Sequence, residues 1–334
     1  MPTHGELIGN LVTAGNVMSL MGCAFVILNY HLIYRRFLVN APNNIIAHHR
    51  SLFFLSIINV FLNGGGLMYQ NLDWKGTRTI CVLQALHITY FNAANWFWGI
   101  CICVNIYTIL LPPEKFLFMR KKIMTKFTIF ALGLPSILML PLITNLDEIG
   151  PVGGWCWIKP AAGGLRIGTF YGWLLLSFVM YIILLVATLY QVSVLRKNPW
   201  EQKRKSRHPY EKLLNRYVLY VLIFFICWTP GAVNRIIQLS NPGFYSFVLD
   251  AMHTYLSISE SFWLSLVFGF TTSLSEIYKI IWKGGLGNVK PANQSSNWSA
   301  SFTGMTKLEE IEHRDDSDGW SRPGDSMISI KSPS

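Results

Sequence analysis

Three polar side chains within one apolar segment have the spacing of a helix face. His253, Ser257 and Glu260 stand at positions i, i+4 and i+7, so a helix would present all of them on one side. An imidazole, a hydroxyl and a carboxylate on one face can bind a polar ligand. Because a carboxylate that faces lipid is costly, Glu260 is expected to face protein, where it is protonated, paired or part of an activation switch.

Two arginines at the borders of other apolar segments could bind an anion. Arg166 directly precedes one segment, and Arg235 directly follows a segment that ends at Asn234. A guanidinium donates two parallel hydrogen bonds to a phosphate or carboxylate, so two of them near one opening suit an anionic ligand. Both could instead reach lipid headgroups, and Arg235 could pair with Asp250. The candidate ligand-binding residues are therefore Trp157, Arg166, Asn234, Arg235, His253, Ser257 and Glu260.

Long apolar helices must position these side chains. A helix needs about 20 apolar residues to cross a hydrocarbon core of ~30 Å. Six such stretches contain no Asp, Glu, Lys or Arg, and a seventh contains only Glu260. Lipid excludes open strands, because their backbone groups would lack hydrogen-bond partners. The sequence therefore predicts an all-α bundle of seven transmembrane helices, with the spans Leu7 to Tyr30, Ser51 to Leu72, Thr79 to Pro113, Phe127 to Leu146, Ile167 to Leu195, Tyr217 to Asn234 and Ala251 to Ser275.

The connections between the spans differ in charge. Lys and Arg concentrate in the first, third and fifth connections and are scarce in the second, fourth and sixth. Basic connections are cytoplasmic, so we expect the N-terminus outside, the C-terminal tail inside and a multi-pass protein of the plasma membrane. The ligand site then lies in the outer half of the bundle, under the loop Trp155-Cys156-Trp157.

Composition agrees with a membrane protein. Charged residues make up 13% of the chain, and the mean hydropathy of +0.35 is too apolar for a soluble globule. The net charge of +11 is mostly the topology signal, and no nucleic-acid-binding motif accompanies it. We therefore expect lipid, and not nucleic acid, as a partner.

The six cysteines divide by depth. Cys81 begins the third span at its outer end, and Cys156 lies in the second outer loop, whereas the others fall within spans. Because only this pair faces the oxidising compartment, a disulfide between Cys81 and Cys156 is favoured over two free thiols.

The pattern changes after the seventh span. Ser273 to Lys283 has apolar residues at helical spacing and charges elsewhere, which predicts a short amphipathic helix on the membrane surface. Residues 284–334 are polar and aperiodic, which predicts a disordered cytoplasmic tail whose serines a kinase could phosphorylate. The chain thus divides into a transmembrane domain, 1–283, and a tail, 284–334.

Several functions of multi-helix membrane proteins require particular residues or repeats. A retinal pump needs a lysine in the last helix, and no Lys occurs between Arg235 and Lys279. A transporter stays open as an alternative, although no repeat relates the two halves. The sequence has no nucleophile elbow, no intramembrane His-Glu-x-x-His motif and no carboxylate pair, so an enzyme lacks support. No cofactor or metal is expected.

Several ordered motifs carry a family resemblance, and they run from about the third span to the seventh. These motifs are Gly154-Trp155-Cys156-Trp157-Ile158, Arg166-Ile167-Gly168, Phe170-Tyr171-Gly172, Cys227-Trp228, Val233-Asn234-Arg235-Ile236 and His253-Thr254-Tyr255-Leu256-Ser257. Together they resemble the cyclic-AMP-receptor family of slime moulds and its fungal relatives, and the tryptophan-flanked cysteine is distantly similar to secretin-like receptors.

The resemblance implies a G-protein-coupled receptor that senses a small extracellular ligand and signals to a heterotrimeric G protein. The ligand could be cyclic AMP or another small cue, such as a sugar, amino acid or lipid. The third inner loop and the inner ends of neighbouring spans would contact the G protein, although their basic residues also serve topology and could bind anionic lipid. The candidate contacts are Arg120, Lys121, Lys203, Arg204, Lys205 and Arg207.

Overall fold

A computed structural model describes residues 4–33, 43–71, 77–111, 123–152, 155–197, 208–241, 244 and 246–271. Some predictions fall outside these residues. They concern the surface helix Ser273 to Lys283, the tail 284–334, and the basic residues Arg120, Lys121, Lys203, Arg204, Lys205 and Arg207.

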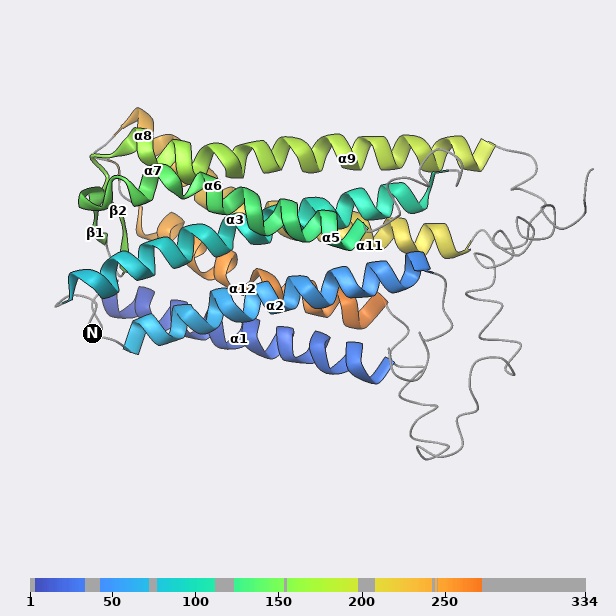
Figure 1. The fold of residues 1–334 in the computed structure, drawn as a ribbon, viewed down its shortest axis with the longest axis horizontal. Helices are drawn as coiled ribbons and strands as arrows, with labels where there is room; N and C mark the ends of the chain where they lie inside the picture. The colour runs from blue at the N-terminus through green and yellow to red at the C-terminus, as the bar shows by residue number, and fades with distance from the viewer. Residues whose placement is uncertain are drawn as a thin grey trace, which may run out of the picture.

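Seven helical columns lie side by side along the long axis of the molecule (Figure 1). Six are dominated by one long helix each: α1 (His4–Ile33), α2 (Asn43–Asn71), α3 (Arg78–Ile109), α9 (Gly172–Lys197), α11 (His208–Ser240) and α12 (Phe247–Thr271). The fourth column joins α5 (Ile123–Thr128), η3 (Ile129–Gly133), α6 (Leu134–Leu138) and α7 (Leu140–Ile143), and α8 (Gly163–Arg166) with η5 (Ile167–Tyr171) leads into α9. The predicted seven-helix bundle is confirmed.

The prolines of the fourth and sixth spans act differently. Pro135 and Pro141 stand near the starts of α6 and α7, where the fourth column is divided into short pieces. Pro230 lies inside α11, which continues past it to Ser240. A proline removes one backbone donor and crowds the preceding turn, so the fourth column is the less regular one.

Length and hydropathy single out five described segments as able to cross a membrane: Gly5–Leu32, His49–Gln70, Ile123–Ile143, Gly163–Leu195 and Tyr217–Gln238. The two remaining columns are α3 and α12. They contain few charges, but Asn92 and Asn95 interrupt the apolar run of α3, and Glu260 with several serines interrupts that of α12. Both columns contribute residues to the candidate site described below.

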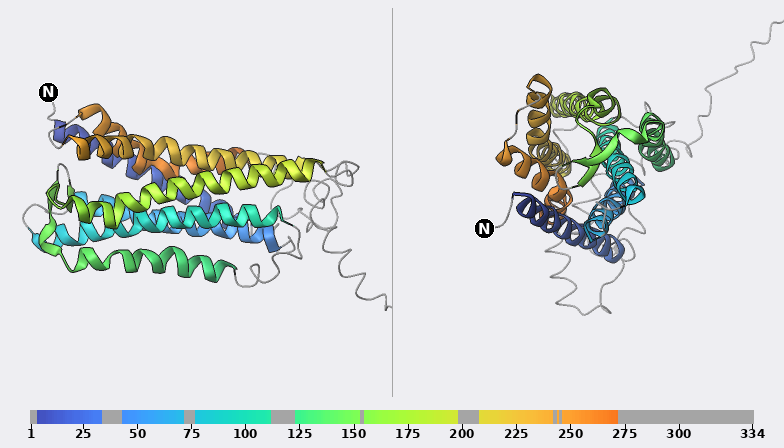
Figure 2. Two further views of the ribbon diagram at one scale, coloured as in Figure 1. Left: turned by 90° about the horizontal axis from the view of Figure 1, so that it is seen from above. Right: turned by 90° about the vertical axis from the view of Figure 1, so that its left-hand side faces the viewer.

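The helices form a ring, which the right-hand view of Figure 2 shows end-on. α1 packs between α2 and α12, α11 packs against α12 and α9, and α3 contacts both α2 and α9. The centre of α3 is the most enclosed part, where Trp96 and Trp98 are 0% and 1% exposed. Trp98 donates its indole N–H to the carbonyl of Ser51 on α2 at 2.7 Å.

A short β-hairpin lies across one end of the ring (Figure 2). Strand β1 (Ile149–Val152) pairs antiparallel with β2 (Trp155–Ile158), and Pro151 is opposite Cys156. This hairpin is an addition to the predicted all-helical fold. The start of α1 lies at the same end as the hairpin (Figure 1), in agreement with an N-terminus and second outer loop on one side.

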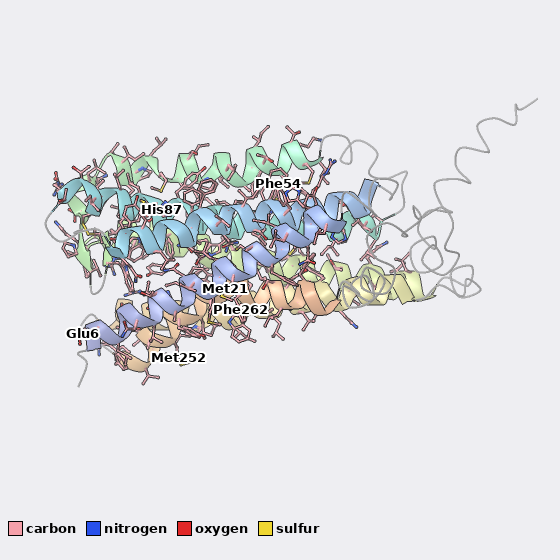
Figure 3. All side chains as sticks on the ribbon, turned by 90° about the horizontal axis from the view of Figure 1, so that it is seen from below. Glu6, Met21, Phe54, His87, Met252 and Phe262 are labelled. Carbon is pink, nitrogen blue, oxygen red and sulfur yellow. A yellow bond between two sulfur atoms is a disulfide. The ribbon has the colours of Figure 1, made fainter. Side chains whose placement is uncertain are left out.

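Large apolar side chains cover the outside of the bundle. Met21 on α1 is 65% exposed and Ile129 on η3 is 68% exposed. Figure 3 shows Met21 midway along α1 and Glu6 near the outer end of the same helix. A protein with so many exposed apolar side chains would aggregate in water, whereas the same surface suits the hydrocarbon of a bilayer.

Candidate ligand-binding site

Strand β2 is attached to the outer end of α3 by a disulfide and two hydrogen bonds. Cys81 and Cys156 form the predicted disulfide, with their Cα atoms 5.1 Å apart. The backbone N–H of Cys156 donates to Gln84 Oε1 at 2.9 Å, and the indole of Trp157 donates to Thr89 Oγ1 at 3.1 Å. These contacts hold β2 along α3, over the interior of the ring.

Arg166 braces the same strand from the other side. It is only 7% exposed, and its Nε and Nη2 donate to the carbonyl of Ile158 at 2.9 and 2.5 Å. Its guanidinium carbon also lies 5.0 Å from the ring centroid of Trp157. The structure therefore places Arg166 against the hairpin, and not among the residues that line the cavity described next.

A cavity with an empty volume of about 910 Å³, partly open to solvent, lies beneath β2. It is bounded by α1, α2, α3, β2, η5, α11 and α12, so nearly the whole ring contributes to it. Of the predicted ligand residues, those on its wall are Trp157, Arg235, His253 and Ser257. The helical spacing of His253 and Ser257 therefore does bring both to one cavity.

One side of this cavity carries polar atoms that the described residues leave unpartnered. Arg235 Nε, His253 Nδ1 and Thr254 Oγ1 are all buried without a hydrogen-bond partner there. The Nη1 of Arg235 contacts Gln238 Oε1, and its guanidinium carbon lies 5.9 Å from the ring centroid of Tyr171. A buried polar group without a partner is costly, so these three atoms are available to hydrogen-bond a ligand in the cavity.

The opposite side of the cavity is rich in side-chain amides. They come from α1, α2 and α3, and they are Asn16, Asn63, Gln70, Gln84 and Asn92. These amides are not among the residues predicted from the sequence, although amides inside otherwise apolar spans are a usable signal.

Glycine on α2 makes room for one of the amides. A Cβ on Gly66 would lie 2.9 Å from Asn16 Oδ1, and a Cβ on Gly65 would lie 2.2 Å from His87 Nε2. Because no side chain stands at these positions, α1 and α3 can bring polar groups close to the α2 backbone. The glycine run therefore shapes the amide side of the cavity.

The third side of the cavity is aromatic. Its members are Trp155, Trp157, Phe170, Tyr171 and Trp228. Phe170 lies between two tryptophans, with ring centroids 5.1 Å from Trp157 and 6.4 Å from Trp228. Aromatic faces of this kind can stack a planar ring.

Glu260 lies deeper, outside the cavity wall. Its Oε2 accepts hydrogen bonds from Asn95 Nδ2 at 2.9 Å and from the indole of Trp228 at 3.1 Å. Asn95 in turn accepts one from Asn59 Nδ2 at 2.9 Å. These residues form a chain through α2, α3, α12 and α11, which we call the Glu260 network: Asn59, Asn95, Glu260 and Trp228.

Asn234 is the third predicted ligand residue away from the cavity wall, after Arg166 and Glu260. It is 1% exposed, and its Nδ2 donates to Asp250 Oδ1 at 3.4 Å. The hydrogen bond described for the Asp250 carboxylate thus comes from Asn234, while Arg235 next to it lines the cavity. Asn234 joins the outer ends of α11 and α12.

Comparison with known proteins agrees with this architecture. The sequence matches the family described as slime mold cyclic AMP receptor over residues 4–281. Among curated proteins of Dictyostelium discoideum, it is 30% identical to cyclic AMP receptor 2 over 263 residues, which covers 77% of this chain and 64% of that protein. It is 27% identical to cyclic AMP receptor 1 over 277 residues, which covers 79% and 63%.

More distant relatives extend the comparison. G-protein coupled receptor 1 of Arabidopsis thaliana is 21% identical over 279 residues, which covers 80% of this chain and 79% of that protein. The match to the Dictyostelium receptors spans less than two thirds of their length. The family match nevertheless includes all seven helical columns and the hairpin that closes the cavity. The chain therefore belongs to the slime mold cyclic AMP receptor family, a family of multi-pass membrane receptors.

Proposed function

We propose that this chain is a G-protein-coupled receptor whose outer cavity binds a small extracellular anion with a planar ring, and that a cyclic nucleotide is the best candidate. The observation that carries the proposal is a group of buried atoms on Arg235, His253 and Thr254 that have no partner among the described residues and lie beside an aromatic wall. A phosphate would supply the missing acceptor for Arg235. A purine could stack on the aromatic side.

The three sides of the cavity match three parts of such a ligand. The guanidinium side suits a phosphate, the aromatic side suits a flat base, and the amides suit the polar edges of a base or sugar. The named activity of the Dictyostelium relatives supports cyclic AMP among the cyclic nucleotides. Arg166 contributes through the hairpin, because it holds the strand that carries Trp155 and Trp157.

Binding of labelled cyclic AMP to membranes that contain the full chain tests the ligand. We expect saturable binding that unlabelled cyclic AMP abolishes and that adenosine, which lacks the phosphate, competes for weakly. Absence of saturable binding would reject cyclic AMP, and equal competition by adenosine would reject the anion site. Accumulation of the label inside sealed vesicles would instead identify a transporter.

Coupling to a G protein is the second part of the proposal. The basic residues Lys203, Arg204, Lys205 and Arg207 stand in the third inner loop of the sequence, where positive charge would steer an acidic partner. Replacing all of them with glutamine should slow ligand-stimulated nucleotide exchange on a heterotrimeric G protein while ligand affinity stays nearly unchanged. Unaltered exchange at equal surface expression would exclude these residues as the contact.

A further inference from the structure

A second cavity lies deeper in the bundle and contains the one carboxylate of the seventh span. It has an empty volume of about 390 Å³, and Asn95, Gly99, Tyr181, Phe224 and Glu260 are among the residues on its wall. Glu260 lies two helical turns from His253, or roughly 10 Å along the axis, away from the outer end of α12. The carboxylate therefore lies well below the ligand cavity.

No cation compensates this carboxylate within the part of the chain that the structure describes. Glu260 is 5% exposed, and both of its described hydrogen bonds come from neutral donors and converge on Oε2. The titratable groups facing it from other helices are the thiols of Cys227 on α11 and Cys103 on α3 and the phenols of Tyr181 on α9 and Tyr220 on α11. None of these carries positive charge.

The ion pair between Arg78 and Asp147 lies far from Glu260, at the outer surface. An ionised carboxylate in a bilayer needs a counter-charge, and neutral hydrogen bonds replace only part of the lost hydration. A bound proton removes the charge without any further ligand. It also leaves both hydrogen bonds to Oε2 possible, because the acid proton can stand on Oε1.

Trp228 connects this carboxylate to the ligand cavity. Its ring is part of the wall of the outer cavity, and its indole N–H donates to Glu260 Oε2. Trp96 packs edge-on against it with ring centroids 4.9 Å apart, so the indole has little freedom to move alone. A ligand that displaces Trp228 must therefore change the hydrogen bonding of Glu260.

We infer that Glu260 is a proton-binding site built into the core of this receptor, and that Trp228 couples its protonation to occupancy of the ligand cavity. The coupling rests on the proposed function, whereas the bound proton does not. The ligand of this second site is a proton rather than a metal ion, because the wall is mainly apolar and offers few oxygen atoms besides the carboxylate.

Infrared spectroscopy of the purified full chain in lipid nanodiscs at neutral pH tests the inference without ligand. A protonated carboxylic acid gives a carbonyl stretching band that a carboxylate lacks. We expect this band in the wild type, its loss in Glu260→Gln and its retention in Glu148→Gln, which changes a glutamate at the outer surface. Trp228→Phe keeps an aromatic ring but removes the donor, so the band should move to the frequency of a more weakly hydrogen-bonded acid.

The outcomes separate the two parts of the proposal. Absence of the acid band at neutral pH, or sodium-dependent thermal stabilisation that Glu260→Gln abolishes, would overturn the proton site. Asn95→Ala removes the other donor to Oε2, so it should shift the band in the same direction as Trp228→Phe. If Glu260→Gln does not fold, these two shifts still assign the band. Addition of cyclic AMP should shift the wild-type band, and binding without a shift would overturn the coupling. Failure of cyclic AMP to bind, with the acid band present, would reject the proposed ligand alone.

Discussion

The outer cavity and the Glu260 network are neighbouring polar regions that treat their hydrogen-bonding groups in opposite ways. In the outer cavity, Arg235, His253 and Thr254 keep buried atoms without partners among the described residues. In the network below, Asn95 and Glu260 are bonded within the protein. Trp228 belongs to both regions.

This difference separates recognition from transmission. Unpartnered buried groups are costly in the empty protein, so a ligand that satisfies them regains that free energy on binding. A network that is already satisfied has nothing to gain from a ligand and can respond only by rearranging. The outer cavity is therefore suited to set affinity, and the Glu260 network is suited to set the response.

Releasing strand β2, which lies over the outer cavity, from α3 should have the largest effect. Cys81→Ser removes the disulfide that attaches β2 to α3, a link whose typical contribution is about 2 to 4 kcal/mol. We expect strongly reduced surface expression and loss of ligand binding, measured by cell-surface labelling and radioligand saturation. Cys23→Ser is the matched control, because Cys23 is a buried free thiol on α1. Ligand binding at the wild-type level by Cys81→Ser would show that attachment of β2 to α3 is not needed for binding.

Removing the hydrogen bonds of Arg166 to the same strand should have a smaller effect. Arg166→Ala deletes two N–H donors to the carbonyl of Ile158, and hydrogen bonds from a charged donor contribute about 1.5 to 3 kcal/mol. Ligand affinity should fall by about tenfold or more. Arg78→Ala is the control, because that guanidinium is largely exposed and its ion pair lies at the surface. Equal ligand affinities for Arg166→Ala and Arg78→Ala would contradict the role of Arg166 in holding β2.

A small overpacking change can sharpen the role of His253. A Cβ on Gly231 would lie 2.3 Å from His253 Cδ2, so Gly231→Ala must push the imidazole away from α11. Overpacking of this kind costs about 1 to 3 kcal/mol, and we expect a lower unfolding temperature together with weaker ligand binding. Gly9→Ala serves for comparison, because a Cβ there meets no atom within 4 Å. Unchanged binding in Gly231→Ala would remove His253 from the site.

The sequence predicted the bundle and the disulfide because both follow from one-dimensional signals. Long stretches without charged residues located the helical columns. The side of the membrane assigned to each connection left Cys81 and Cys156 as the two cysteines that could be oxidised to a disulfide. The hairpin was missed because its strands have only four residues each. The Gly153-Gly154 pair before the β-prone Trp155-Cys156-Trp157-Ile158 was an available signal for a tight turn.

The candidate site was only partly predictable. His253 and Ser257 belong to one helix, so their spacing alone places them on one face. The amides Asn16, Asn63 and Asn92 come from different helices, and their meeting depends on how the ring closes. The direction of Arg166 depends on the hairpin, since only the strand brings the Ile158 carbonyl within its reach.

The most direct test of the division between recognition and transmission compares Arg235→Ala with Glu260→Gln in two assays. One assay measures the affinity for labelled cyclic AMP, and the other measures the maximal rate of nucleotide exchange on a heterotrimeric G protein at saturating ligand. We expect Arg235→Ala to weaken affinity by about tenfold or more, with nearly normal exchange once the cavity is filled, and Glu260→Gln to change exchange more than affinity. Arg235→Ala that binds as tightly as the wild type, or Glu260→Gln that loses affinity as strongly as Arg235→Ala, would contradict this account.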